Sequence, residues 1–188
     1  MNIGQASGQS GVDTVGARPP GEVRDGHRDF DFHIGTWRTY LRRLERPLSG
    51  SSTWLTYEGT TAVRGMWGGR ANLVELDVAG PAGRIEGLSL RLYDPAARQW
   101  SLHYASRSSG VLTLPVIGEF RSARGEFHGL DSVGGRSILV RFVITPITPD
   151  SIRFEQSFSD DGARTWEVNW IAFDTRVKSA SPPGGSAR

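Results

Sequence analysis

The chain contains no cysteine among its 188 residues, which excludes disulfide bonds, thiolate metal sites, iron–sulfur clusters and cysteine nucleophiles together. It also lacks any apolar run near the roughly 18 residues that a membrane-spanning helix needs. Neither sign of charge is in large excess, because the chain has 22 Lys+Arg and 20 Asp+Glu. The arginines are also spread along the chain. There is thus no basic stripe typical of nucleic-acid binding. These absences predict a soluble, cytoplasmic protein that binds neither nucleic acid nor a membrane.

Common enzyme motifs are absent as well. The sequence has no Gly-x-Ser-x-Gly elbow, no phosphate-binding Gly-x-x-x-x-Gly-Lys-Ser/Thr loop, no His-Glu-x-x-His and no dinucleotide fingerprint. These absences argue against nucleotide-driven chemistry and serine hydrolysis. We therefore expect no cofactor.

Glycine and proline, by contrast, are plentiful, and 24 Gly with 10 Pro leave little room for long helices. The 37% of hydrophobic residues, including 10% aromatics, is too rich for a disordered chain. The Gly, Ser and Pro content of residues 1–28 and 178–188 predicts flexible tails. Residues 29–177 then form one domain, which fits the size of a single hydrophobic core.

Within residues 29–177, apolar and polar side chains alternate in short runs, which is the period of half-buried strands. In the last run, Trp166, Val168, Trp170 and Ala172 share one face. Turn residues such as Gly134-Gly135 and Asp160-Asp161-Gly162 separate the runs and favour hairpins. The predicted strands are residues 36–44, 53–64, 71–78, 84–93, 99–106, 116–121, 126–131, 137–145, 151–158 and 165–174.

An antiparallel meander of this many strands has two unpaired edges unless it closes on itself. Closure predicts an all-β fold, an antiparallel up-and-down β-barrel with about 8–10 strands. Alternation alone does not separate such a barrel from a β-sandwich, which is the second interpretation.

The segment Asp29-Phe-Asp-Phe-His-Ile-Gly-Thr-Trp37 places Gly-x-Trp after an aromatic lead-in and before the first predicted strand. It resembles the lipocalin and calycin signature. The resemblance implies that Gly35 lets a short N-terminal lead-in helix pack tightly and that Trp37 closes one end of the barrel. Phe30 and Phe32 are then expected to plug that end.

Two later segments strengthen the resemblance, namely Tyr93-Asp94-Pro95 followed by Trp100, and Phe158-Ser-Asp-Asp-Gly162 followed by Trp166 and Asn169-Trp170. Together the motifs are similar to bacterial lipocalin-like domains of unknown function over residues 29–176. The resemblance implies a calycin barrel and a small apolar ligand. It does not favour the haem-binding nitrobindins, because Arg38-Thr39-Tyr40 follow the Gly-x-Trp and no histidine lies beyond His128.

Four candidate metal ligands, His27, Asp29, Asp31 and His33, alternate with other residues and would share one side of an extended backbone. If Phe30 and Phe32 plug the barrel, this polar side faces water and a lead-in turn scatters the groups. We therefore expect no metal site.

Several charged or polar residues lie in the middle of predicted strands: Glu75, Arg91, Arg141, Glu155 and Asn169. Buried charges are costly unless they are paired, so such residues on one barrel wall indicate a polar network or a ligand anchor. Arg141 has six apolar neighbours and is the leading anchor, with Glu155 as its cross-strand partner. The alternative is an outward Arg–Glu pair on a solvated face, which adds little stability.

Aromatic and titratable residues complete the candidate site. His103 lies mid-strand on the same face as Arg107, and either face of that strand is a candidate for the lumen. Burial would adapt His103 or Glu155 to acid–base chemistry. The candidate ligand-binding residues are Trp54, Tyr57, Glu75, Arg91, Tyr104, Arg107, Arg141, Asn169 and Trp170. Core packing without a cavity is an equal alternative for each aromatic residue.

Three functions are compatible with this pattern. The first is a lipocalin-like barrel that binds a small, largely apolar molecule bearing an anionic or carbonyl group. The second is a cofactor-independent cyclase or isomerase of a biosynthetic pathway, with His103 and Glu155 as its catalytic residues. The third is a protein-interaction barrel with a filled core. The sequence is also compatible with a homodimer.

Overall fold

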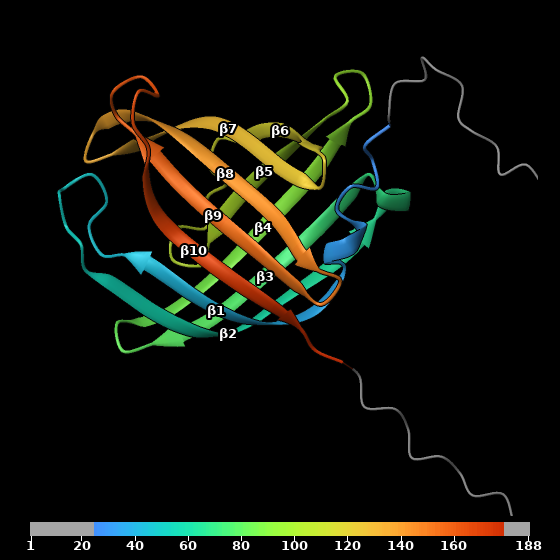
Figure 1. Cartoon of the computed structure of the whole chain (residues 1–188), viewed down its shortest axis with the longest axis horizontal. Coiled ribbons are helices and arrows are strands. Elements are labelled where there is room, and N and C mark those ends of the chain that lie inside the picture. Colours follow the sequence, from blue (N-terminus) through green and yellow to red (C-terminus); the bar gives the residue numbers. More distant parts are fainter. Residues whose placement is uncertain (1–24, 179–188) are drawn as a thin grey trace, which may run out of the picture.

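A computed structural model of the chain describes residues 25–178 (Figure 1). Residues 1–24 and 179–188 of the two predicted tails therefore lie outside the described residues. In the part that is described, Lys178 forms an ion pair of 2.9 Å with Asp150.

The described chain folds into ten strands and two single turns of 3-10 helix. The helical turns are η1 (Asp31–His33) and η2 (Trp67–Gly69). The strands are β1 (Gly35–Leu44), β2 (Trp54–Met66), β3 (Ala71–Gly80), β4 (Gly83–Asp94), β5 (Gln99–Ser106), β6 (Val116–Arg121), β7 (Arg124–Val133), β8 (Arg136–Thr148), β9 (Ser151–Ser159) and β10 (Glu167–Arg176).

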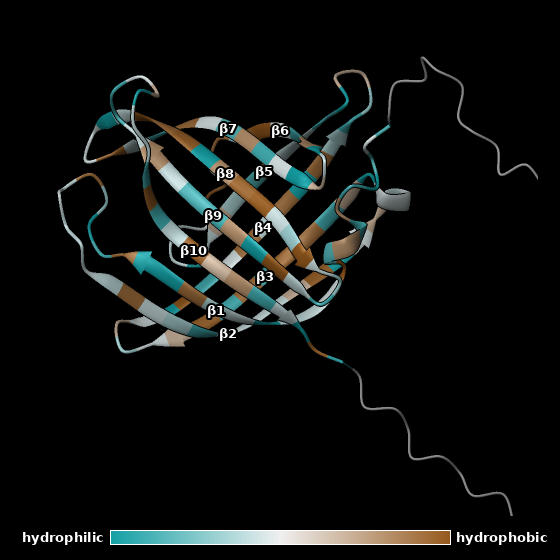
Figure 2. Ribbon diagram, in the orientation of Figure 1, coloured by the Kyte–Doolittle hydropathy of each residue, from teal (hydrophilic) through white to brown (hydrophobic). Residues whose placement is uncertain are grey.

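Every strand pairs with its neighbours in the sequence, and β1 also pairs with β10, so the sheet closes into an antiparallel up-and-down barrel. This closure confirms the predicted fold class. It excludes the β-sandwich, because all ten strands hydrogen-bond on both sides. Hydrophilic and hydrophobic residues alternate along the strands in Figure 2, as expected for strands with one face toward the barrel interior. Each predicted strand overlaps an observed one, and the largest error is the end of β8, predicted at residue 145 and observed at Thr148.

The lead-in segment closes one end of the barrel, at the right of Figure 1. The Phe30 side chain is 1% exposed and makes edge-to-face contacts with the rings of Trp100 and Phe120, each at 4.9 Å between centroids. The indole nitrogen of Trp37 donates to the carbonyl of His33 at 2.8 Å. The predicted plug is therefore present, and its short helix is the single turn η1.

Arg176, at the end of β10, fastens this plug to the barrel. Its guanidinium donates to the carbonyls of Phe32 at 2.6 Å and Ile34 at 2.8 Å, and it lies over the Trp37 ring at 4.1 Å. Gly35 has φ +127°, and a Cβ there would lie 2.9 Å from Arg176 Nη1. A glycine is therefore required where the lead-in turns into β1.

The opposite end of the barrel carries longer connections. The segments 45–53, 107–115 and 160–166 all join strands at this end, and the first of them is the cyan loop at the left of Figure 1. We call it the open end, and the end covered by η1 the plugged end. No helix in residues 25–178 is long and apolar enough to cross a membrane.

Candidate functional site

The barrel encloses a cavity of about 430 Å³. Its lining runs from His33 and Arg91 beside the plug to Pro47 and Leu114 in the loops of the open end. The barrel is therefore not filled by its side chains, which argues against the interaction barrel with a filled core.

Five buried polar residues form the inner end of the cavity, which we call the floor: His33, Thr39, Thr61, Arg91 and Asp174. Arg91 Nη1 lies 3.0 Å from His33 Nδ1, and His33 Nε2 lies 3.5 Å from Asp174 Oδ2. Thr39 donates its hydroxyl to Asp174 Oδ1 at 2.6 Å and lies 2.7 Å from the Thr61 hydroxyl.

The chemistry of these groups fixes the direction of each hydrogen bond. A guanidinium only donates, so His33 Nδ1 accepts from Arg91 and the proton of the neutral imidazole sits on Nε2, facing Asp174. Because Thr39 donates its only hydroxyl proton to Asp174, the Thr61 hydroxyl donates to the Thr39 oxygen. Burial lowers the pKa of His33 from 6.5 to about 4, although Asp174 opposes this shift. His33 is therefore a neutral link between Arg91 and Asp174.

Arg91 is the one cation of the floor, and its surroundings are unusual for a charged group. The side chain is buried and lies over the Phe30 ring at 4.4 Å. Its Nε is buried without a hydrogen-bond partner, and no carboxylate in residues 25–178 forms an ion pair with it. Burial lowers the pKa of Arg91 from its usual value to about 9, and the charge of Asp174 opposes the shift. The floor thus places on the cavity wall a guanidinium that has no carboxylate partner.

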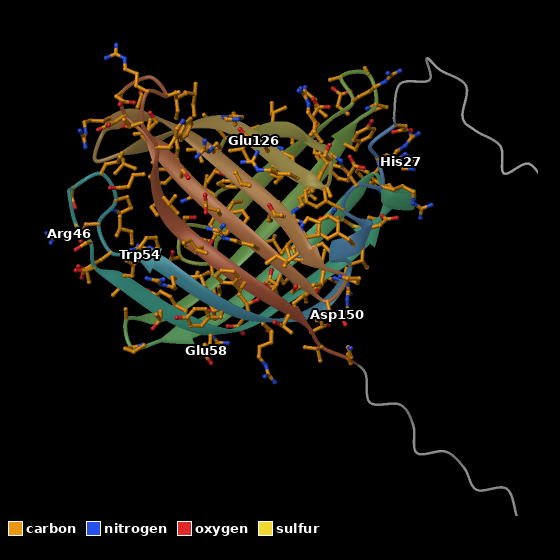
Figure 3. All side chains as sticks on the ribbon, in the orientation of Figure 1. His27, Arg46, Trp54, Glu58, Glu126 and Asp150 are labelled. Atoms are coloured by element: carbon orange, nitrogen blue, oxygen red, sulfur yellow. The ribbon has the colours of Figure 1, made fainter. Side chains whose placement is uncertain are left out.

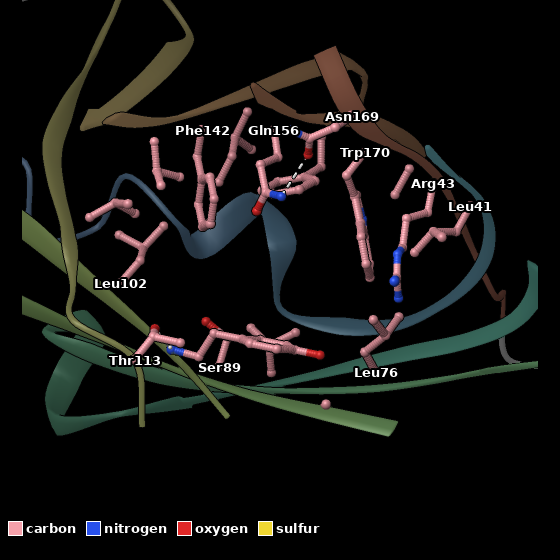
Figure 4. A pocket seen from close by; sticks show the side chains of 18 of the residues that line it. Leu41, Arg43, Leu76, Ser89, Leu102, Thr113, Phe142, Gln156, Asn169 and Trp170 are labelled. Carbon is pink, nitrogen blue, oxygen red and sulfur yellow. Dashed lines mark hydrogen bonds between the residues drawn. The ribbon is translucent and has the colours of Figure 1, made fainter. Parts of the chain in front are cut away.

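Apolar side chains surround the cavity above the floor. They come from all sides of the barrel and include Leu41, Val74, Leu102, Phe142, Ile144 and Phe154. Figure 4 shows Leu41, Leu102 and Phe142 on different walls around the same space. This belt can bury a hydrocarbon segment of a ligand.

The cavity wall is polar again near the open end. The pairing of β9 with β10 shifts between Val168 and Trp170, which is a β-bulge at Asn169. A bulge breaks strict alternation, and here both Asn169 and Trp170 line the cavity. Gln156 Nε2 donates to Asn169 Oδ1 at 2.8 Å, as the dashed line in Figure 4 marks. Arg43 of β1 also lines this level, opposite Trp170 in register.

Tyr104 of β5 lies against the backbone of β4. A Cβ built on Gly87 would lie 2.5 Å from the Tyr104 hydroxyl oxygen and 2.6 Å from Cε2. Burial raises the pKa of Tyr104 above its usual value, which the charge of Arg43 opposes. Gly87 therefore makes room for a phenol that forms part of the cavity wall.

Four of the predicted ligand-binding residues line the cavity, namely Arg91, Tyr104, Asn169 and Trp170. Tyr57 is buried beside the cavity, where it packs with Leu41, Val78 and Ala172. Sequence reasoning thus identified the floor cation and part of the upper wall.

The structure places Arg141, the predicted leading anchor, outside the cavity. Val140 and Phe142 line the cavity, so Arg141 between them faces outward and lies over the Trp166 ring at 4.5 Å. Its predicted partner Glu155 is also on the outer surface, where it pairs with Arg153 of its own strand. The register pairs Arg141 with Ser157 and Glu155 with Val143. The predicted Arg141–Glu155 pair is therefore absent.

His103 likewise faces outward, because its neighbours Leu102 and Tyr104 line the cavity. The predicted catalytic residues, His103 and Glu155, thus share no cavity in this fold. Strand geometry is the reason, since adjacent residues point to opposite faces.

The remaining candidates lie on the outer surface too. Glu75 faces Arg64 at 3.6 Å, and Arg107 pairs with Glu86 at 2.7 Å. Trp54 begins β2, near the open end in Figure 3, and Arg42 lies over its ring at 5.0 Å. The cavity lining includes none of Glu75, Arg107 and Trp54.

Sequence reasoning missed most of the floor. Thr39 follows the inward Trp37 by two residues, and Asp174 follows Ala172 by two, so each lies on a face that the alternation had already identified. The sequence pattern indicates His33 only as a candidate metal ligand. Its three candidate partners are spread apart, since His27 contacts Asp25 and Asp31 pairs with Arg28. Residues 25–178 contain no cluster of three or more metal-ligating side chains.

Comparison with known proteins supports the fold. No protein-family model matches the chain, and no curated protein matches it in sequence. The chain is similar to the solved S-type phycobiliprotein lyase CPES from Guillardia theta, with 11% identity and a TM-score of 0.56 over 80% of this chain and 92% of that chain. It also resembles EF1p2_mFAP2b bound to DFHBI, with 11% identity and a TM-score of 0.44 over 81% of this chain and 99% of that chain.

At such low identity the likeness shows the fold alone. The protein belongs by its architecture to the closed up-and-down β-barrels that surround a central cavity. The resemblance to bacterial lipocalin-like domains stays a prediction, since no family model matches.

Proposed function

We propose that the protein binds a small, largely apolar molecule whose acceptor oxygen, from a carboxylate or a carbonyl group, is held by Arg91 at the floor of the cavity. The observation that carries this proposal is the buried guanidinium of Arg91, which lines the cavity and forms no ion pair with a carboxylate of residues 25–178. A buried charge without an opposite charge costs free energy, and a ligand oxygen that accepts from the guanidinium lowers that cost.

The rest of the floor supports this orientation of the ligand. Thr39 donates its hydroxyl to Asp174, so this carboxylate is partly satisfied within the protein, and His33 Nε2 lies 3.5 Å from it without forming a hydrogen bond. Arg91 keeps N–H groups for a ligand, since His33 takes only Nη1. The apolar belt then buries the hydrocarbon part, at roughly 25 cal/mol for each Å² removed from water. The acid–base alternative receives no such support, because His103 and Glu155 lie outside the cavity.

The proposal is tested by calorimetric titration with sodium decanoate and with a methyl ketone of the same chain length. We expect one molecule of at least one probe to bind to the wild type. Arg91→Met should weaken that binding about tenfold or more, since hydrogen bonds to charged groups are worth about 1.5–3 kcal/mol. The preferred probe identifies the head group as a carboxylate or a carbonyl.

Arg107→Met is the matched control, because Arg107 is exposed and pairs with Glu86 on the outer surface. It should bind like the wild type. Arg91→Lys keeps the charge in case Arg91→Met folds poorly, and we expect it to bind with intermediate affinity. The proposal fails if neither probe binds, or if a folded Arg91 variant binds as tightly as the wild type.

A further inference from the structure

A second polar site lies on the cavity wall, above the apolar belt. Gln156 of β9 and Asn169 of β10 both line the cavity and are joined by a hydrogen bond of 2.8 Å. Asn169 is 1% exposed, and it reaches the cavity wall through the β-bulge in β10. Polar amides among apolar side chains are costly unless their hydrogen bonds are satisfied. This pair is therefore a place where a ligand can be recognised.

The backbone fixes which way both amides point. Asn169 Nδ2 contacts the carbonyl oxygen of Glu167 at 3.4 Å, and a carbonyl only accepts, so the nitrogen faces Glu167. Asn169 Oδ1 is then turned toward Gln156 and accepts from Nε2. This leaves the Gln156 carbonyl oxygen as an acceptor that points away from Asn169 into the cavity, as Figure 4 shows. The second N–H of Gln156 is a donor beside it.

The register gives the separation of this pair from the floor. Ile152 pairs with Asp174 of the floor, and Gln156 follows four residues later on β9. A strand rises about 3.3 Å per residue, and barrel strands tilt by about 35–45°, so Gln156 lies about 10 Å farther toward the open end. Apolar residues such as Phe154 and Ala172 occupy the levels between them. The cavity is thus polar at two levels and apolar between.

We propose that the ligand carries a second oxygen function, a hydroxyl group, which Gln156 binds about 10 Å above the floor, where Arg91 holds the head group. This inference rests on the proposed function and narrows its ligand class to hydroxylated acyl chains or similar bifunctional amphiphiles. A hydroxyl fits the site because it both donates to Gln156 Oε1 and accepts from Nε2. An unsubstituted chain leaves the carbonyl oxygen and the second N–H of Gln156 without a partner, which lowers its affinity.

The test compares decanoate with ω-hydroxydecanoate by calorimetric titration, because the extended chain of either acid is long enough to reach from Arg91 to Gln156. Moving a hydroxyl group from water into an apolar cavity costs free energy unless it forms a hydrogen bond there. Tighter binding of the hydroxy acid therefore requires a polar side chain in the cavity that pairs with the hydroxyl group. We expect the wild type to bind ω-hydroxydecanoate about fivefold to tenfold more tightly than decanoate.

Gln156→Leu should reverse the order, so that decanoate binds more tightly than the hydroxy acid. Gln156→Met provides the same test if the leucine variant does not fold. Gln99→Leu is the matched control, since Gln99 begins β5 at the plugged end and does not line the cavity. It should keep the wild-type preference.

The outcomes separate the two proposals. If decanoate binds through Arg91 but the wild type shows no preference for the hydroxy acid, the second site is rejected and the proposed function stands. A preference that survives both folded Gln156 variants also rejects the site. If neither acid binds, the proposed function fails for carboxylates, and this inference fails with it.

Discussion

His33 and Arg91 are joined by a hydrogen bond of 3.0 Å between Nδ1 and Nη1, although both side chains are buried at the floor of the barrel. His33 comes from the lead-in turn and Arg91 from the middle of the chain, so this contact ties the plug to the wall of the cavity. Because Arg91 can only donate, the contact selects the tautomer of His33 with its proton on Nε2.

The first prediction concerns this tautomer. Nitrogen NMR of labelled protein should show His33 neutral at pH 7, with Nε2 protonated and Nδ1 bare. Its titration should occur near pH 4, because burial lowers its pKa from 6.5 to about 4. A charged His33 at neutral pH, or a proton on Nδ1, would contradict the hydrogen-bond directions assigned to the floor.

The same shift predicts how stability depends on pH. A folded-state pKa of about 4 against 6.5 means that the unfolded chain binds the proton more readily, so the free energy of unfolding falls as pH drops from 6.5 to about 4. The loss from this group is on the order of 3 kcal/mol. His33→Gln cannot titrate, yet its amide can accept from Arg91. Denaturant unfolding at several pH values should therefore show a weaker dependence in this variant over that range.

The plug yields a third prediction. Trp37 is fully buried beneath Arg176, and Trp37→Ala should lower the free energy of unfolding by about 3–5 kcal/mol, because it leaves a large cavity. Trp67→Ala is the control, since Trp67 is exposed and should be replaced with little loss. Chemical denaturation of both variants measures the difference. Similar stabilities for the two would show that Trp37 does not hold the plug in place.

The strands and the plug could be predicted from sequence because alternation and the Gly35–Trp37 motif are local signals. The cavity face of each strand was harder to predict. Alternation divides a strand into two faces without saying which is inward. On β4 the more apolar face is the outer one. Leu88, Leu90 and Leu92 point outward there, while Ser89 and Arg91 point into the cavity.

Two further features depend on contacts that a single sequence does not reveal. The bulge at Asn169 brings two consecutive residues to the cavity wall, and it exists only in the pairing of β9 with β10. The floor joins His33, Arg91 and Asp174 from distant parts of the chain. The buried charge on Arg91 is stabilised through these long-range contacts, which strand periodicity does not encode.

The turn between β9 and β10 gives a fourth prediction. Asp161 accepts hydrogen bonds from the backbone N–H groups of Thr165 and Arg164, both at 3.0 Å, and from the Ser159 hydroxyl at 2.8 Å. These bonds, led by the one from Thr165, lower the pKa of Asp161 from 3.8 to about 2. Its carboxylate therefore stabilises the fold above pH 3.8, and this contribution is lost as pH falls toward 2.

Asp161→Asn should accordingly lower the melting temperature at neutral pH, and its deficit should shrink below about pH 4. Asp160→Asn is the control, because Asp160 makes a surface ion pair with Arg136 at 3.2 Å and accepts none of the turn hydrogen bonds that Asp161 accepts. Thermal melts of both variants over this pH range provide the measurement. An equal, pH-independent effect of the two substitutions would rule out the special role of Asp161.

The fifth prediction uses the close contact between Gly87 and Tyr104. Gly87→Ala places a Cβ 2.5 Å from the phenol oxygen, so the Tyr104 ring must move away from β4. Overpacking of this kind costs about 1–3 kcal/mol, and because Tyr104 lines the cavity we also expect weaker binding of decanoate. Tyr104→Leu removes the clashing atoms, so the double variant should recover stability lost by Gly87→Ala. A double-mutant cycle of unfolding free energies measures this coupling, and simple additivity of the two changes would show that the ring does not pack on Gly87 in solution.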